Sequence, residues 1–257
     1  MPSDSQAARP RGGINAVAPL APNARLRYDV VERMLPDGIT DVLEIGCGQG
    51  SVGARLAQRY HYLGLEPDRA SWELARQRLR AVGRGEVRNI ASGDLGTERF
   101  DLVCAFEVLE HLEDDAAAVK QWAALLRARG WLLLSTPALQ RRFGPFDELV
   151  GHFRRYDPPA MAALLAGCGF GEIEIRQYGF PLAYLLEAAR NVIGRRRLAA
   201  AADRTAAERT AGSGRILQPS GRVRGAAIEW GTAPFRLVQR AFPHTGPGLV
   251  VRARLAG

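Results

Sequence analysis

The stretch that decides the fold is Val42-Leu43-Glu44-Ile45-Gly46-Cys47-Gly48-Gln49-Gly50-Ser51. It begins as a short apolar run and turns on three alternate glycines, and an amphipathic segment follows. This order predicts a buried strand, a tight loop and a helix. The glycines permit positive φ and let backbone N–H groups approach a ligand closely in front of a helix N-terminus. Glu44 is unusual, because a carboxylate in a buried strand needs a partner, which a ligand with an ammonium or hydroxyl groups would supply.

Alternating strand and helix signals continue on both sides of this stretch. A helix over 23–35 precedes it, and further strands are predicted at 62–66, 87–91, 100–106 and 131–136, with helices over 69–82 and 115–129. Such alternation predicts an α/β fold with a doubly wound, mostly parallel sheet. A stretch without regular structure is expected over 138–157, and a helix begins at Asp157 with Pro158.

Two later segments, 170–178 and 249–255, alternate apolar and polar residues as strands do. We expect them to pair antiparallel, so that Glu172 and Glu174 face Arg252 and Arg254 across the ladder. They would complete a seven-stranded sheet whose last strand is antiparallel.

Acidic residues follow two of the predicted strands. Glu66 ends the strand at 62–66, and Asp94 with Leu95 lies in the loop after the strand at 87–91. Ligands of open α/β sheets bind outside the carboxyl ends of the strands. A carboxylate in the position of Glu66 can accept hydrogen bonds from both hydroxyls of a ribose.

The series from 42 to 137 resembles the class I S-adenosylmethionine (SAM) dependent methyltransferases. The glycine loop with Glu44 two residues before it is similar to their motif I, and 100–112 is similar to their motif IV. The resemblance implies a Rossmann-like fold, SAM as the cofactor and S-adenosylhomocysteine as its product. It assigns the adenine amino group to Asp94 and the face of the ring to Leu95. The cofactor-binding positions that it implies are Glu44, Gly46, Cys47, Gly48, Gly50, Glu66, Asp94, Leu95, Phe106 and Glu107.

Methyl transfer to a hydroxyl requires a base with a pKa near neutrality. The histidines are His61, His111, His152 and His244. His111 and His152 fall where the acceptor is expected, and we predict His152 first and His111 second as catalytic residues. A structural imidazole is an equally good interpretation of His111.

Glu107-x-x-Glu110-His111 also resembles the metal-binding Glu-x-x-Glu-His of some methyltransferases, including RNA 3′-end and ubiquinone-pathway types. There, a divalent ion polarises the acceptor hydroxyl. The candidate ligands are Glu107, Glu110, His111 and, as a fourth, His152. Many relatives carry the same letters without a metal, so no metal is predicted.

Composition favours a globular protein. The chain has 257 residues, of which 47% are hydrophobic and 24% charged, and this is enough for one domain over 23–257 after a disordered N-terminal segment over 1–22. Neither a membrane span nor a secretory signal is recognisable. The three scattered cysteines, Cys47, Cys104 and Cys168, indicate reduced thiols and predict a cytoplasmic protein.

The positive charge is concentrated in one region. The formal net charge is +8, and a predicted helical insertion at about 181–247 holds eleven arginines against four acids, a net +7 (11 − 4). This insertion would be a lid over an acidic or lipid-linked substrate, a surface on an anionic membrane, or a packing or dimer element with a solvated basic face. A mobile loop is expected near 211–221.

The sequence therefore predicts a SAM-dependent O-methyltransferase of a small-molecule or lipid-like acceptor, with peripheral contact with an anionic membrane as an added expectation. An RNA methyltransferase lacks support because no RNA-binding module is recognisable, so nucleic acid is not expected as a partner. A NAD-type oxidoreductase is opposed by Glu44, since a carboxylate repels the phosphates that such folds bind. A non-catalytic SAM-binding or membrane-associated partner protein remains open, as does the oligomeric state.

Overall fold

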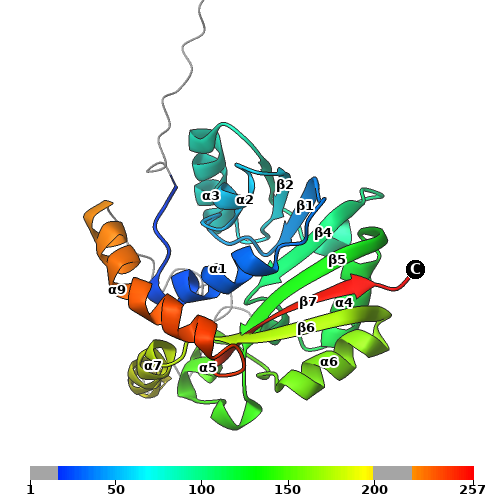
Figure 1. Ribbon diagram of the computed structural model, residues 1–257. Coiled ribbons are helices and arrows are strands. Elements are labelled where there is room, and N and C mark those ends of the chain that lie inside the picture. The colour runs from blue at the N-terminus through cyan, green and yellow to red at the C-terminus, as the bar shows by residue number, and fades with distance from the viewer. Residues whose placement is uncertain (1–16, 199–221) are drawn as a thin grey trace, which may run out of the picture.

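A seven-stranded sheet forms the centre of the protein, in the order β3-β2-β1-β4-β5-β7-β6 (Figure 1). The computed structural model describes residues 17–198 and 222–257. Strands are parallel from β3 to β5, and β7 runs antiparallel to both β5 and β6. The strands are β1 (Asp41–Ile45), β2 (His61–Leu65), β3 (Glu86–Arg88), β4 (Phe100–Phe106), β5 (Leu126–Pro137), β6 (Phe170–Tyr178) and β7 (Gly248–Leu255). The prediction of a mostly parallel, Rossmann-like sheet with an antiparallel last strand is confirmed.

Helices cover both faces of this sheet (Figure 1). They are α1 (Pro22–Met34), α2 (Gly53–Leu56), α3 (Arg69–Val82), α4 (Asp115–Ala123), α5 (Pro145–Val150), α6 (Pro158–Gly167), α7 (Leu182–Leu198) and α9 (Arg222–Ala241). Three single turns of 3₁₀ helix, η2 (Ser92–Asp94), η3 (Leu109–His111) and η4 (Gln140–Arg142), lie in the connections.

The core has two halves because successive side chains of a strand point to opposite faces. On one face Val42 and Leu102 pack with α1, α2 and α3. On the other, Leu43 and Ile45 pack with Trp122 of α4 and with α6. Strand β1 is thus buried on both sides, which explains why its sequence is a continuous apolar run interrupted only by Glu44.

The helix expected over 115–129 ends earlier than predicted. Helix α4 stops at Ala123 and Leu126 already belongs to β5. Leu126 pairs with Phe100 of β4, and the register of the two strands then shifts before the next pair. Strand β5 therefore begins before Gly130, and the helix has to end earlier. The third strand is also shorter than the expected 87–91, since β3 covers only 86–88 and the chain then turns into η2.

The stretch at 138–157, predicted to lack regular structure, contains η4 and α5. Helix α5 forms because Pro145 occupies its first turn and the Asp147 carboxylate accepts a hydrogen bond from the Gly144 N–H at 2.8 Å. This short helix turns out to carry part of the candidate active site.

Helices α7 and α9 are the described part of the predicted insertion at 181–247. Their existence agrees with the sequence, but several of their large apolar side chains are exposed instead of packed. None of the described helices combines the length and the apolar character that crossing a bilayer requires. Most of the predicted disordered segment at 1–22 lies outside the described residues, and so does the predicted loop at 211–221.

The predicted contacts between β6 and β7 are present. The Arg252 guanidinium donates to Glu174 at 2.8 Å, and that of Arg254 donates to Glu172 at 3.4 Å. Both guanidinium groups also lie over the Trp131 ring, 5.0 Å from its centroid. The edge strand β6 is therefore held by cross-strand charge pairs in addition to its ladder.

We expect the double variant R252E/R254E to melt a few degrees below the wild type. Each cross-strand pair contributes about 0.2–1 kcal/mol, and about 1 kcal/mol shifts the melting temperature of a protein of this size by about 2–4 °C. Differential scanning calorimetry measures the shift. The quadruple variant that also carries E172R/E174R is the control, and it should recover part of the loss. An unchanged melting temperature of the double variant would contradict a stabilising role for these pairs.

Candidate active site

The glycine loop connects β1 to α2 and requires residues without a side chain. Gly46, Gly48 and Gly50 have φ values of 65°, 55° and 73°, in the left-handed region that favours glycine. A Cβ on Gly46 would lie 2.7 Å from a methyl carbon of Val108, and one on Gly50 would lie 2.9 Å from the Cβ of Ala75. The loop is therefore in close contact with both α3 and the segment after β4.

Glu66 follows directly after β2 and reaches the glycine loop. One carboxylate oxygen accepts a hydrogen bond from the Gly48 N–H at 2.8 Å, and the other accepts one from the Asp68 N–H at 2.8 Å. Burial raises the pKa of Glu66, and these two N–H donors act in the opposite direction. Each oxygen keeps lone pairs for further donors, so the carboxylate can still accept two hydroxyl groups.

Glu44 finds part of its missing partner within the protein. The Tyr62 hydroxyl donates to its carboxylate at 2.6 Å, and the side chain is almost completely buried. Burial raises the pKa of Glu44 to about 7, and the hydrogen bond from Tyr62 offsets only part of that effect. Tyr62 thus already supplies one partner of the Glu44 carboxylate. A ligand would contact only the lone pairs that Tyr62 does not use.

A cavity of about 1120 Å³ opens at the carboxyl ends of β1, β2 and β4. Its volume slightly exceeds the roughly 300–1,000 Å³ of a site for one drug-sized molecule, which leaves room for two substrates side by side. One end is lined by the glycine loop and Glu66. The other end is lined by α5, by His152 and by Ala183, Glu187 and Arg190 of α7.

His152 is held in a fixed orientation at this second end. Its Nδ1 lies 2.8 Å from an oxygen of Asp147, and Asp147 also accepts hydrogen bonds from the Arg155 guanidinium. Burial alone would raise the pKa of Asp147, but the donors from His152 and Arg155 outweigh it and lower the pKa. An ionised carboxylate on Nδ1 leaves Nε2 as the ring nitrogen that can take a proton from a ligand, the arrangement typical of an oriented general base.

Arg155 joins α5 to α7 inside the protein. It donates to Asp147 and also to Glu187, which in turn accepts hydrogen bonds from Arg142 at 2.7 and 2.9 Å. Arg155, Asp147 and Glu187 are all buried. Buried charges are tolerated only when they are paired in this way, so the network fixes the position of α7 beside the cavity.

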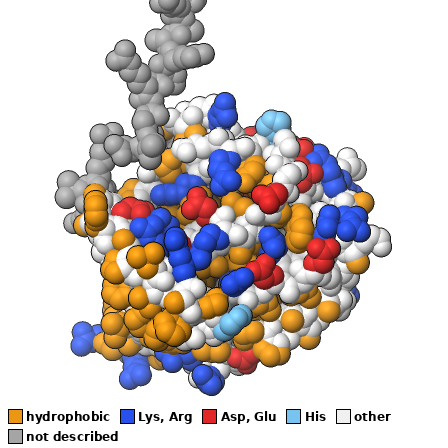
Figure 2. Space-filling model, viewed as in Figure 1, with side chains coloured by type: hydrophobic (Ala, Val, Ile, Leu, Met, Phe, Trp, Pro, Cys, Tyr) orange, Lys and Arg blue, Asp and Glu red, His pale blue; other side chains and the backbone are white. Residues whose placement is uncertain are grey.

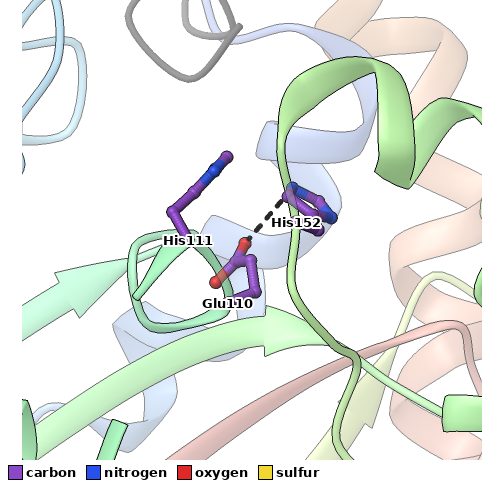
Figure 3. Close-up of side chains that lie close together, drawn as sticks. All are labelled: Glu110, His111 and His152. Atoms are coloured by element: carbon purple, nitrogen blue, oxygen red, sulfur yellow. Dashed lines mark ion pairs between the residues drawn. The ribbon is translucent and has the colours of Figure 1, made fainter. Parts of the chain in front are cut away.

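Glu110, His111 and His152 come together beside the cavity (Figure 3). Their candidate ligand atoms lie within 4.8 Å of one another, and Nε2 of His152 is 3.9 Å from a Glu110 oxygen. Burial lowers the pKa of His111 to about 4, with His152 adding to the effect, so the His111 imidazole is neutral at neutral pH. Among the described residues neither buried Glu110 oxygen has a hydrogen-bond partner, and burial raises the Glu110 pKa. This donor set fits a divalent cation, which binds the ionised form of a carboxylate.

Glu107, the remaining candidate ligand, is engaged elsewhere. One of its oxygens lies 3.3 Å from the Arg27 guanidinium and accepts hydrogen bonds from Ser135 at 3.0 Å and Tyr178 at 3.4 Å. The structure therefore brings together three of the four candidate ligands predicted from the sequence.

Part of the chain is similar in sequence to known methyltransferases. Residues 43–132 match the family model described as "Methyltransferase domain". The chain is 34% identical over 119 residues to a ubiquinone biosynthesis O-methyltransferase of Leptothrix cholodnii, covering 43% of this chain and 50% of that protein. It is also 34% identical over 154 residues to a probable S-adenosylmethionine-dependent methyltransferase of Mycobacterium tuberculosis, covering 57% of this chain and 55% of that protein.

Residues 43–132 of the chain therefore match a methyltransferase domain, and the relatives named above are methyltransferases. The chain spans about half the length of the two curated relatives named above.

Solved structures of similar fold differ in the reaction that their names give. A SAM-dependent methyltransferase from Thermotoga maritima superposes with a TM-score of 0.54 at 17% identity, covering 90% of this chain and 89% of that one. The [4+2]-cyclase SpnF superposes with a TM-score of 0.58 at 18% identity, covering 90% and 80%. At such identities the likeness shows the fold alone, and the reaction has to be argued from the site.

Most of the cofactor positions implied by the family resemblance line the cavity. They are Glu44, Gly46, Cys47, Gly48, Glu66, Phe106 and Glu107, joined by both candidate catalytic residues, His111 and His152. Gly50 lies behind the loop against α3. Asp94 is exposed in η2 and Leu95 packs in the core on the α4 face, and neither lines the cavity. Their assignment to the adenine stays a prediction.

Several cavity residues were not predicted from the sequence. Asp147 and Glu187 support the second end, and Arg27 and Arg190 bring two cations to the lining. Nothing in the sequence showed that Arg155 pairs inward with two carboxylates. Arg27 and Arg190 come from helices at opposite ends of the chain, so only the fold reveals that both reach one cavity.

Glu44 should make the stability of the protein depend on pH. Its pKa of about 7 in the folded state lies above its ordinary value of 4.5, so the folded state binds the proton more tightly. The stabilisation is present at low pH and is lost as the pH rises through about 7. Relative to Glu44→Gln, the wild type should lose about 2 kcal/mol of unfolding free energy between about pH 5 and about pH 8. Urea denaturation at several pH values measures it, with Glu73→Gln as the exposed control. Parallel curves for wild type and Glu44→Gln would contradict the raised pKa.

Proposed function

We propose that this methyltransferase transfers a methyl group from SAM to an oxygen of a small-molecule or lipid-like acceptor, releasing S-adenosylhomocysteine. The observation that carries the proposal is the arrangement of one cavity, with the glycine loop and Glu66 at one end and an oriented histidine at the other. SAM supplies a methyl group on a positively charged sulfur with a good leaving group. The protein then has to place the acceptor in line and exclude water.

The donor end of the cavity suits a nucleoside with a positive charge. Glu66 is proposed to accept the ribose hydroxyls, with its orientation fixed by Gly48 and Asp68. The positive-φ glycines let the backbone approach the ligand closely. Glu44 on the cavity wall would face the ammonium group of the donor, and a nearby cation would favour its ionised form. Two carboxylates at this end also argue against a dinucleotide, whose phosphates they would repel.

The acceptor end suits a hydroxyl on a largely apolar molecule. His152 is proposed to take the hydroxyl proton on Nε2, while Asp147 on Nδ1 stabilises the imidazolium that forms. Phe146, Val150 and Phe153 line this end and would contact an apolar acceptor. The name of the relative from Leptothrix cholodnii, a ubiquinone biosynthesis O-methyltransferase, supports an acceptor of this class. We further propose that the protein meets a lipid-like acceptor by peripheral contact with an anionic membrane.

A metal-assisted version of the same reaction is favoured by one observation, the buried Glu110 carboxyl group without a hydrogen-bond partner beside His111 and His152. A divalent ion bound there would polarise the acceptor hydroxyl and replace His152 as the activating group. In that case His152 would be a ligand and would not act as the base.

Mass spectrometry tests the reaction class directly. Lipid and polar fractions of a cell extract are incubated with the protein and deuteriomethyl SAM. We expect a product that carries the deuterated methyl group and that is absent with the His152→Gln variant. SAM binding without any labelled product in either fraction would instead favour a non-catalytic SAM-binding role.

Glu66→Ala should weaken SAM binding by about tenfold or more, because it removes charged hydrogen bonds to the ribose. Isothermal titration calorimetry measures the change, and NAD should give no heat with either protein. The matched control is Glu86→Ala on the exposed end of β3, which should bind SAM as the wild type does. Equal affinity of Glu66→Ala and wild type would place the ribose elsewhere.

His152→Gln should lower kcat by about 10²–10⁴-fold, as expected for loss of a general base, and leave the dissociation constant for SAM unchanged. The exposed His61→Gln is the control and should keep full activity. Exhaustive chelation should leave the wild-type activity intact. Loss of activity on chelation, with recovery after addition of a divalent ion, would overturn the role as base in favour of a metal.

A further inference from the structure

Large apolar side chains are exposed mainly on one part of the protein. Of nine such side chains among the described residues, seven lie on α7, on α9 or directly after α9. Scattered exposed apolar residues are normal, but a group of them marks a contact surface. We call this group the α7/α9 surface: Leu185, Val192, Ile193, Trp230, Leu237, Val238 and Phe242.

Each helix has one packed face and one exposed apolar face. On α9, Thr232 and Gln239 are buried toward the domain, while Trp230 is 81% and Leu237 65% exposed. On α7, Leu185 is 69% exposed. The ring of Phe180 before α7 lies 5.3 Å from that of Phe242 after α9, so the start of α7 and the end of α9 lie close together. In Figure 2, apolar side chains gather at the lower left, where Figure 1 places α7 and the end of α9.

The exposed charged residues of α7 are arginines. Arg195, Arg196 and Arg197 are exposed in the last turn of α7, and none forms an ion pair with another described residue. The residues of α7 and α9 classed as exposed include no Asp or Glu where side chains are described. Aromatic and aliphatic groups beside unpaired arginines are typical of protein surfaces that bind anionic lipid. A second copy of the chain would bring more arginines, while the Glu229 carboxylate of α9 is already paired with Arg25 and Arg236.

Helix α7 also connects this surface to the cavity. Ala183, Glu187 and Arg190 line the cavity from one side of the helix, and Leu185 and Val192 lie on the exposed side. A lipid-like molecule leaving a bilayer at this surface would therefore have only one helix to pass before it reached the acceptor end.

We propose that the α7/α9 surface docks the protein on an anionic lipid bilayer, with Trp230 and Leu237 in the interfacial layer and Arg195 to Arg197 on lipid phosphates. The inference extends the proposed lipid-like acceptor, but it concerns binding alone. The test of membrane binding uses neither SAM nor acceptor. Failure of methyl transfer would therefore not contradict membrane binding, and failure of membrane binding would not contradict the proposed reaction.

The full chain is mixed with phosphatidylcholine vesicles with or without phosphatidylglycerol, and binding is measured by sedimentation and tryptophan fluorescence. We expect binding to the anionic vesicles only, weakening with added salt, together with a blue shift that Trp230→Phe abolishes. Trp230→Glu with Leu237→Glu should weaken binding about tenfold or more, and so should R195E/R196E/R197E.

Matched controls separate this surface from general charge and hydrophobicity. Leu74→Glu changes an exposed leucine of α3, and R69E/R80E/R84E reverses three exposed arginines in and after the same helix. Both should bind anionic vesicles as the wild type does. Equal loss in R69E/R80E/R84E would overturn the assignment to this surface. Absence of binding, or sedimentation velocity in which Trp230→Glu converts a dimer to a monomer, would overturn the bilayer as occupant.

Discussion

Three alternate glycines with positive φ let the loop after β1 pack closely against its neighbours at the carboxyl edge of the sheet. A Cβ on Gly46 would meet Val108, and a Cβ on Gly50 would meet Ala75. The loop after β1 can therefore contact α3 and the segment after β4 at the same time. The Gly48 N–H then meets the carboxylate of Glu66 at the end of β2. Without this close approach the cavity would have no donor end.

The acceptor end depends on a different kind of constraint, a buried network of charges. Arg155 pairs with Asp147 and Glu187, and so fixes α5 and α7 together around the cavity. Removing one member would leave a buried charge unpaired, which is far more destabilising than the loss of an exposed salt bridge. The same Asp147 orients His152. Asp147 thus contributes both to the stability of the fold and to the proposed chemistry. At the donor end, the position of the side chains depends mainly on the backbone of the glycine loop.

Helix α7, which lies between β6 and β7 in the chain, separates the cavity from the surface of the protein. One side of α7 lines the cavity and the other side carries exposed apolar residues and three arginines. A helix with this division can serve a site and a docking surface at once. The excess positive charge of the chain is concentrated in one region of the sequence, and the exposed arginines of α7 belong to that region.

The sequence by itself determined the sheet, because glycine spacing, apolar runs and alternating strands depend on local backbone physics. It also located Glu44, Glu66, His111 and His152, since residues that directly follow parallel strands or mark a known motif need little tertiary information. Only the tertiary structure decided that Glu107 pairs with Arg27, that Asp94 is exposed, and that Leu126 leaves its helix for β5. These outcomes depend on contacts between residues far apart in the chain, whose energies no local pattern records. The exposure of Trp230 and Leu237 belongs to the same class, because an apolar helical stripe has the same sequence whether or not another element covers it.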